Sequence, residues 1–109
     1  MSGFALMPPP GARIVVAGGC GGMGRLFVRT AVDAGIAVVV LDLARSIETF
    51  PPPEGVQAVA CDASDEGQVA AAFEAIAAGG AHLDALVNFV GFTNEPKPVE
   101  AMALAEWNE

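Results

Sequence analysis

Glycines and an aspartate at a defined spacing are the residues of this chain best suited to chemistry. Residues 18–24 read Gly-Gly-Cys-Gly-Gly-Met-Gly, and glycine lets a backbone turn sharply and approach a bound group closely. Where a helix follows such a turn, its first N–H groups attract phosphate. Asp42 follows the glycines by about 20 residues, the spacing at which a carboxylate accepts hydrogen bonds from ribose hydroxyls. Together these groups predict a dinucleotide site, whereas either feature alone would also suit a structural turn or a loop aspartate.

Two buried strands and the helix between them are the elements that would position these groups. Residues 13–17 and 37–41 are rich in β-branched side chains without polar alternation, as expected of strands buried on both faces of a parallel sheet. Residues 22–34 predict a helix that ends at Gly35. The glycine turn then follows the first strand, and Asp42 ends the second.

The spacing of apolar residues also predicts which face of this helix is buried. We expect four residues on the buried face, namely Met23, Phe27, Ala31 and Ala34. The charged residues Arg25, Arg29 and Asp33 are expected to point toward solvent.

The remainder of the chain repeats the alternation of strand and helix. Residues 44–55 form a connector with three consecutive prolines, which exclude regular structure, although a short helix can precede them. Strands are expected at 56–60 and 83–88, separated by a helix that Ser64 or Asp65 caps. Right-handed crossovers would order the strands 3-2-1-4. The predicted fold class is α/β, a Rossmann-type doubly wound parallel sheet that stops before a fifth strand.

Composition narrows the possible partners. The net charge is −8 with only five Lys and Arg residues among 109, which argues against nucleic-acid binding. No apolar run reaches the ~18 residues of a membrane span, and no signal-peptide pattern occurs, so we expect a cytoplasmic protein without a membrane partner. Cys20 and Cys61 lack metal-ligand spacing and are expected to be reduced and buried. Residues 1–12 are expected to form a flexible Pro-rich leader, and residues 13–109 a partial dinucleotide-binding domain.

Asp42 also predicts which dinucleotide binds. Its carboxylate would repel a 2′-phosphate, and the following Leu43 offers no positive charge to offset that repulsion. We therefore expect NAD in preference to NADP. Arg45 lies close enough in sequence to pair with a 2′-phosphate, but a solvated loop charge is the preferred interpretation.

Two overlapping glycine patterns point to different families. Gly18, Gly22 and Gly24 fit G-x-x-x-G-x-G and resemble the motif of short-chain dehydrogenases/reductases. Gly19, Gly21 and Gly24 fit the ordinary G-x-G-x-x-G fingerprint, and the same run is similar to the nucleotide loop of prephenate dehydrogenases.

Three later segments extend the resemblance to short-chain dehydrogenases. Cys61-Asp62-Ala63 resembles the family's aspartate motif after the third strand, and Leu86-Val-Asn-Phe-Val-Gly91 resembles the Asn-Asn-Ala-Gly motif after the fourth. Residues 104–109 are similar to the opening of the long helix that follows. The departures are Ala17 in place of Thr, and Phe89-Val90 in place of Asn-Ala. The prephenate dehydrogenase likeness stops after the first helix and therefore ranks second.

The resemblance implies roles for individual residues. The three glycines of the first pattern would cradle the pyrophosphate, Asp42 would bind the ribose and Asp62 the adenine ring. Asn88 and Gly91 would line the nicotinamide side. The complete set of expected cofactor-binding residues is Gly18, Cys20, Gly21, Gly22, Met23, Gly24, Asp42, Leu43, Cys61, Asp62, Ala63, Asn88, Phe89, Val90 and Gly91.

The residues that carry out proton transfer in this family have no counterpart here. The chain has no Tyr, its one Lys, Lys97, lies in a proline-flanked loop, and none of its serines follows a fifth strand. We therefore assign no catalytic residue and no metal ligand. The expected identity is the N-terminal, NAD-binding half of an oxidoreductase that transfers hydride between NAD and an alcohol or carbonyl, present as a fragment and inactive alone.

Two alternatives stay open. The chain could be a complete, non-catalytic nucleotide-binding or regulatory module, or part of an enzyme that another chain completes. We expect a homo-oligomer or completion by the missing C-terminal half, and the substrate is not specified by these residues.

Overall fold

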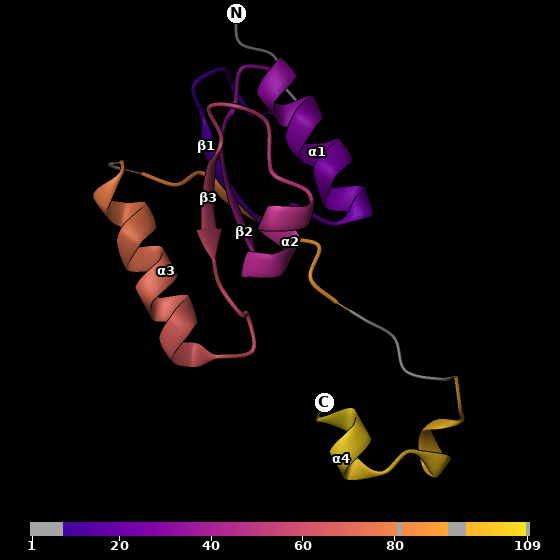
Figure 1. The fold of residues 1–109 in the computed structure, drawn as a ribbon. Coiled ribbons are helices and arrows are strands. Elements are labelled where there is room, and N and C mark those ends of the chain that lie inside the picture. The colour runs from indigo at the N-terminus through magenta and orange to yellow at the C-terminus, as the bar shows by residue number, and fades with distance from the viewer. Residues whose placement is uncertain (1–7, 81, 92–95, 109) are drawn as a thin grey trace, which may run out of the picture.

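A four-stranded sheet with helices on both faces forms the body of the protein (Figure 1). The computed structural model describes residues 8–80, 82–91 and 96–108. Its elements are β1 (Arg13–Ala17), α1 (Gly22–Asp33), β2 (Ala37–Asp42), α2 (Ala44–Thr49), β3 (Gln57–Ala60), α3 (Glu66–Ala78), β4 (Ala85–Asn88), the 3-10 helix η1 (Val99–Ala101) and α4 (Leu104–Trp107).

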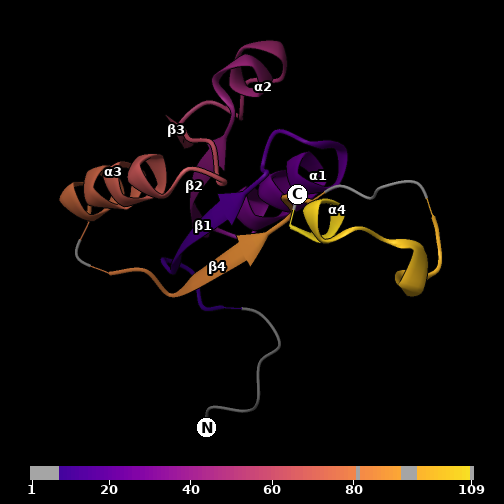
Figure 2. The same ribbon diagram turned by 90° about the horizontal axis from the view of Figure 1, so that it is seen from below.

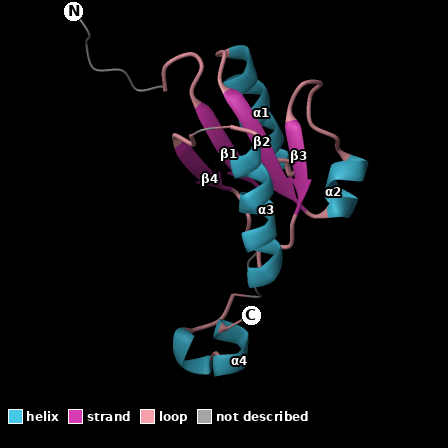
Figure 3. Ribbon diagram, turned by 90° about the vertical axis from the view of Figure 1, so that its left-hand side faces the viewer, coloured by secondary structure: helices cyan, strands magenta, loops and turns pink. Residues whose placement is uncertain are grey.

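All neighbouring strands are parallel, and their order is β3-β2-β1-β4, which confirms the predicted fold and strand order. Figure 2 shows β4 on the outer side of β1, and Figure 3 shows the shared strand direction. Ala17 at the end of β1 is in register with Leu41 of β2 and with Asn88 of β4. The segments that leave these strands therefore start at one common edge of the sheet, the carboxyl edge.

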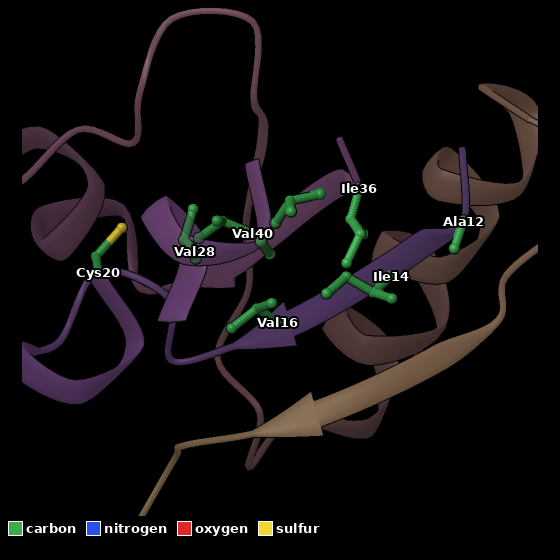
Figure 4. Packing of buried hydrophobic residues seen from close by; sticks show 9 residues of the cluster. Ala12, Ile14, Val16, Cys20, Val28, Ile36 and Val40 are labelled. Atoms are coloured by element: carbon green, nitrogen blue, oxygen red, sulfur yellow. The ribbon is translucent and has the colours of Figure 1, made fainter. Parts of the chain in front are cut away.

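Alternate residues of the central strands pack on opposite faces of the sheet. Ile14 and Val16 belong to the cluster under α1, which also contains Val28 and Val40 (Figure 4), whereas Val15 belongs to the cluster under α3. Val15, Val16 and Val40 have no exposed surface. Full burial of each such side chain contributes about 1.5–3 kcal/mol, so the central strands supply much of the stability.

The rotation of α1 about its axis differs from the sequence prediction. Met23 and Ala34 are exposed, with 75% of the Met23 surface accessible, and the buried residues of α1 are Gly24, Val28 and Ala31. The cause is the close contact of Gly24 with the glycine loop that precedes the helix. This contact sets the rotation of α1 so that Gly24, Val28 and Ala31 face the sheet. The predicted burial of Ala31 was correct, and Arg25 is exposed as expected.

Two residues that precede the first strand contact the body of the protein. Ala12 is buried, and the N–H of Gly11 donates to the carbonyl of Gly35 over 3.1 Å. At the other end, η1 and α4 lie apart from the sheet, on the side of its carboxyl edge (Figures 1 and 3). Within the described residues, no helix is long and apolar enough to cross a membrane.

Candidate functional site

The glycine turn after β1 is held between β2 and β4. The N–H of Gly18 donates to the carbonyl of Leu41 over 2.8 Å, and the N–H of Phe89 donates to the carbonyl of Ala17 over 2.8 Å. Gly18 has a φ of +76°, and a Cβ at this position would lie 3.0 Å from the backbone nitrogen of Val90. Glycine is therefore required here for both its conformation and its size.

Gly24 allows α1 to begin directly against the turn. A Cβ on Gly24 would lie 2.1 Å from the carbonyl oxygen of Gly18, a distance that no packed side chain tolerates. A Cβ on Gly19 would lie 2.8 Å from a methyl carbon of Val40. Both glycines thus serve close packing inside the protein, and neither leaves a gap for a ligand.

Gly22 differs from these two glycines because the space beside it is open. Apart from its chain neighbours and the backbone of its own helix, a Cβ on Gly22 would meet no atom within 4 Å, and one on Gly21 would meet the carbonyl oxygen of Gly18 at 3.5 Å. Gly22 begins α1, a helix of 12 residues, so N–H groups without intrahelical acceptors lie in its first turn. Open space beside such N–H groups fits a phosphate.

Asp42 lies at the end of β2 and contacts the glycine turn. Its Oδ2 accepts a hydrogen bond from the N–H of Cys20 over 3.0 Å, and its Oδ1 accepts one from the N–H of Leu43 over 2.8 Å. The carbonyl of Asp42 accepts from the N–H of Cys61 over 2.9 Å. An ionised carboxylate offers about four acceptor positions, so these two N–H groups leave capacity for hydroxyl donors.

Cys20 is a buried free thiol with 2% of its surface exposed. Burial raises the pKa of the Cys20 thiol, the nearby Asp42 carboxylate raises it further, and Arg25 partly opposes both effects. A raised pKa leaves less of the thiolate, the nucleophilic form, than an ordinary cysteine has. Cys61, also free and buried, has a pKa raised mainly by burial and secondarily by Asp62. Both findings agree with the sequence interpretation of reduced, buried cysteines.

The segment after β3 forms a turn around Asp62. The Oδ1 of Asp62 accepts hydrogen bonds from the Oγ of Ser64 over 2.6 Å and from the Ser64 N–H over 2.9 Å. These bonds favour the ionised carboxylate and lower the pKa of Asp62. Asp65 caps α3 by accepting from the N–H of Gln68 over 3.0 Å. Ala63 is exposed at this turn.

The segment after β4 explains the departure from the family pattern at Phe89. The Phe89 ring packs against Phe27 of α1 with 5.5 Å between ring centroids and against the core under that helix. The Oδ1 of Asn88 accepts from the N–H of Val90 over 2.8 Å, and this bond closes the turn. Val90 is half exposed, and a Cβ at Gly91 would meet no atom within 4 Å.

The structure thus gathers the predicted residues at one edge of the sheet but gives them different surroundings. Gly22, Asp42 and Gly91 adjoin open space or retain unused acceptors, whereas Gly18 and Gly24 are enclosed by backbone. Met23 and Leu43 are exposed. Sequence reasoning missed one neighbour of this edge, the stacking of Arg25 over the Phe50 ring, because no local pattern relates two residues so far apart.

Comparison with known proteins identifies the family. The model of a family described as Enoyl-(Acyl carrier protein) reductase matches residues 18–109. The chain is also 33% identical over 104 residues to short chain dehydrogenase/reductase dpchG of Colletotrichum higginsianum, a match that covers 90% of this chain. The chain belongs to the short-chain dehydrogenase/reductase family. Of the two glycine patterns, the one formed by Gly18, Gly22 and Gly24 is therefore the pattern of this chain's family.

Two solved structures of oxidoreductases share the fold. Aldohexose dehydrogenase of Thermoplasma acidophilum, in ligand-free form, gives a TM-score of 0.72 at 27% identity, with 91% of this chain and 36% of that chain covered. A 3-ketoacyl-(acyl-carrier-protein) reductase of Brucella melitensis, complexed with NADH, gives 0.73 at 27% identity, with 91% and 42% covered. The chain spans 39% of the length of the Colletotrichum relative.

Proposed function

We propose that this chain is the NAD-binding portion of a short-chain dehydrogenase/reductase that transfers hydride between NAD and an alcohol or carbonyl. The observation that carries the proposal is the position of Asp42, whose carboxylate reaches the glycine turn at Cys20 and still has free acceptor capacity. The turn and the aspartate thus form one continuous surface at the carboxyl edge, as a nucleotide with a phosphate and a ribose requires.

The residues fit the parts of the cofactor in order. The first turn of α1 beside Gly22 receives the pyrophosphate, and Asp42 receives the adenosine ribose. The turn at Asp62 borders the adenine, and Asn88 with Gly91 borders the nicotinamide. The bound dinucleotide would supply or accept the hydride. The relative solved with NADH supports a nicotinamide cofactor for this edge.

NAD is favoured over NADP by charge. A 2′-phosphate next to the Asp42 carboxylate would place like charges together, and Leu43, which follows directly, offers no positive charge. The 2′-hydroxyl of NAD donates to that carboxylate instead.

The proton that accompanies the hydride would come from residues outside this sequence. With no Tyr in the chain, no side chain here matches the family's proton donor. We propose that a C-terminal half, on the same polypeptide or on another chain, supplies the proton donor and the substrate pocket. The exposed apolar residues of β4 and α4, Leu86 at 58% and Trp107 at 70%, favour this proposal over a self-sufficient regulatory module.

The decisive test is calorimetric titration of the chain with NAD and with NADP at matched ionic strength, with light scattering to establish the oligomeric state. We expect saturable NAD binding and affinity for NADP at least tenfold lower. Equal affinity for the two would remove Asp42 from the ribose role. The absence of NAD binding by a folded, monodisperse sample would contradict the site itself.

A further inference from the structure

A cavity between α1 and the segment Pro51–Pro53 lies apart from the residues assigned to the dinucleotide. Its volume is about 270 Å³, and its walls are α1 on one side and Pro51–Pro53, which follow α2, on the other. Only Gly19 of the glycine turn reaches it, and a Cβ there would point at Val40 in the core. The cavity therefore serves no step of the proposed cofactor binding.

Two arginines, Arg25 and Arg29, line this cavity together with one acidic residue, Asp33. In the part of the chain that the structure describes, the ion pairs are His82–Asp84 and Lys97–Glu106, so neither arginine forms an ion pair with a described residue. The chain has 13 acidic residues and only five Lys and Arg residues. Two arginines against one aspartate in the cavity lining of such an acidic protein favour an anionic occupant.

One of the two arginines, Arg25, is held in place before any ligand arrives. The guanidinium carbon of Arg25 lies 4.1 Å from the centroid of the Phe50 ring, a cation–π contact. Phe50 directly precedes the three prolines, whose φ angles are fixed by their rings. Less conformational entropy is therefore lost when a ligand binds, which favours affinity.

The rest of the lining indicates what the anion carries. Val28 and Val32 give the wall an apolar strip, so the body of the ligand is apolar. Asp33, which lies one helical turn beyond Arg29, also lines the cavity. It repels a second negative charge and accepts a hydrogen bond from a donor. These groups together select a monoanion with a hydroxyl at the opposite end.

We propose that this cavity binds a small hydroxylated aromatic monocarboxylate, with its carboxylate on Arg25 and Arg29, its ring on the valine strip and its hydroxyl on Asp33. Pro51–Pro53 form the other wall of the cavity, which the ring would also contact. The proposal does not depend on cofactor binding, because it uses no group of the carboxyl edge.

The test uses 4-hydroxybenzoate, benzoate and benzyl alcohol as probes in NMR titrations of the chain without cofactor. We expect saturable binding of 4-hydroxybenzoate, weaker binding of benzoate and none of the neutral alcohol. Arg25→Gln and Arg29→Gln should each weaken 4-hydroxybenzoate about tenfold, the loss typical of one charge-assisted hydrogen bond. Arg45→Gln is the matched control, because Arg45 is exposed outside the cavity, and it should leave the affinity unchanged.

Two further variants separate shape from charge. Val32→Phe fills the cavity without changing any charge and should abolish binding, while Asp33→Ala should remove the preference for 4-hydroxybenzoate over benzoate. Absence of saturable binding by the folded wild-type chain would overturn the proposal. An equal loss of affinity in Arg45→Gln would overturn it as well, because the attraction would then be a general charge effect.

Discussion

The carboxylate of Asp42 accepts a hydrogen bond from the backbone N–H of Cys20, with 3.0 Å between Oδ2 and nitrogen. This bond joins the end of β2 to the glycine turn after β1. The aspartate therefore fixes the conformation of the turn before any ligand is bound, in addition to offering acceptors to a ribose. Its replacement should affect the protein in both respects.

Asp42→Ala is expected to weaken NAD binding by roughly tenfold to a hundredfold, the range for loss of hydrogen bonds to a charged group. Asp33→Ala, at an exposed site of equal charge, should leave NAD affinity unchanged. The double substitution Asp42→Ala with Leu43→Arg should shift the preference toward NADP. Calorimetry measures all three, and an unchanged preference in the double variant would contradict the ribose assignment.

The two glycines at the start of α1 should respond differently to substitution. Gly24→Ala should destabilise the fold by about 3 kcal/mol or more, because its Cβ would overlap the carbonyl oxygen of Gly18. Gly22→Val should change stability by only about 0.5 kcal/mol, since valine is no poorer a helix residue than glycine. It should nevertheless abolish NAD binding by filling the open space beside the first turn.

Urea denaturation and calorimetry on the same samples distinguish these effects. If Gly22→Val bound NAD with wild-type affinity, the open space beside Gly22 would not be the phosphate site. If Gly24→Ala kept wild-type stability, the close packing of Gly24 against the Gly18 carbonyl would not be required for the fold.

The Phe27–Phe89 contact is expected to couple α1 to the segment after β4. A tilted aromatic pair contributes about 0.5–1.5 kcal/mol beyond its buried area. The double-mutant cycle with Phe27→Leu and Phe89→Leu should therefore give a coupling energy in that range, measured by urea denaturation. Additive effects of the two substitutions would show that the rings act independently.

Asp62 should titrate below the ordinary range of an aspartate. Because its folded-state pKa is lowered by Ser64, its contribution to stability is complete above the unfolded-state pKa and is lost as pH falls through the folded-state pKa. Ser64→Ala should raise the pKa of Asp62, as read from the NMR shift of its carboxyl carbon. Ser46→Ala is the control and should leave the pKa of Asp62 unchanged. Identical titration curves of Asp62 in the wild type and both variants would contradict the assigned hydrogen bond.

The apolar surface of β4 and α4 should make the isolated chain self-associate. β4 lies at one end of the strand order, so one side of it lacks a strand partner among the described residues, and Leu86 is 58% exposed there. Leu86→Lys should lower the mean mass measured by light scattering. Leu26→Lys, at an exposed position on α1, is the comparison. If both substitutions lowered the mean mass equally, the effect would come from the added positive charge and not from the loss of the Leu86 surface.

Most of the fold was predictable from local sequence. Neighbouring residues alone were enough to predict three features. These are the apolar strands around Val15 and Val39, the cap of α3 at Asp65 and the end of that helix at Gly79. The strand order follows from the right-handedness of parallel crossovers, which is why it could be derived without coordinates. The aspartate at the end of β2 was likewise placed by its distance from the glycines.

The sequence by itself therefore determined the α/β architecture, the family and the edge of the sheet at which the site lies. Only the tertiary structure decided which glycine serves packing and which leaves space, because that depends on atoms from β2 and β4 that approach the turn. It also decided that Met23 is exposed, that Phe89 packs into the core, and that Arg25 reaches Phe50 beside a cavity. Local pattern fixes which elements form, but contacts between distant residues depend on how those elements rotate and pack, and spacing along the chain does not encode that rotation.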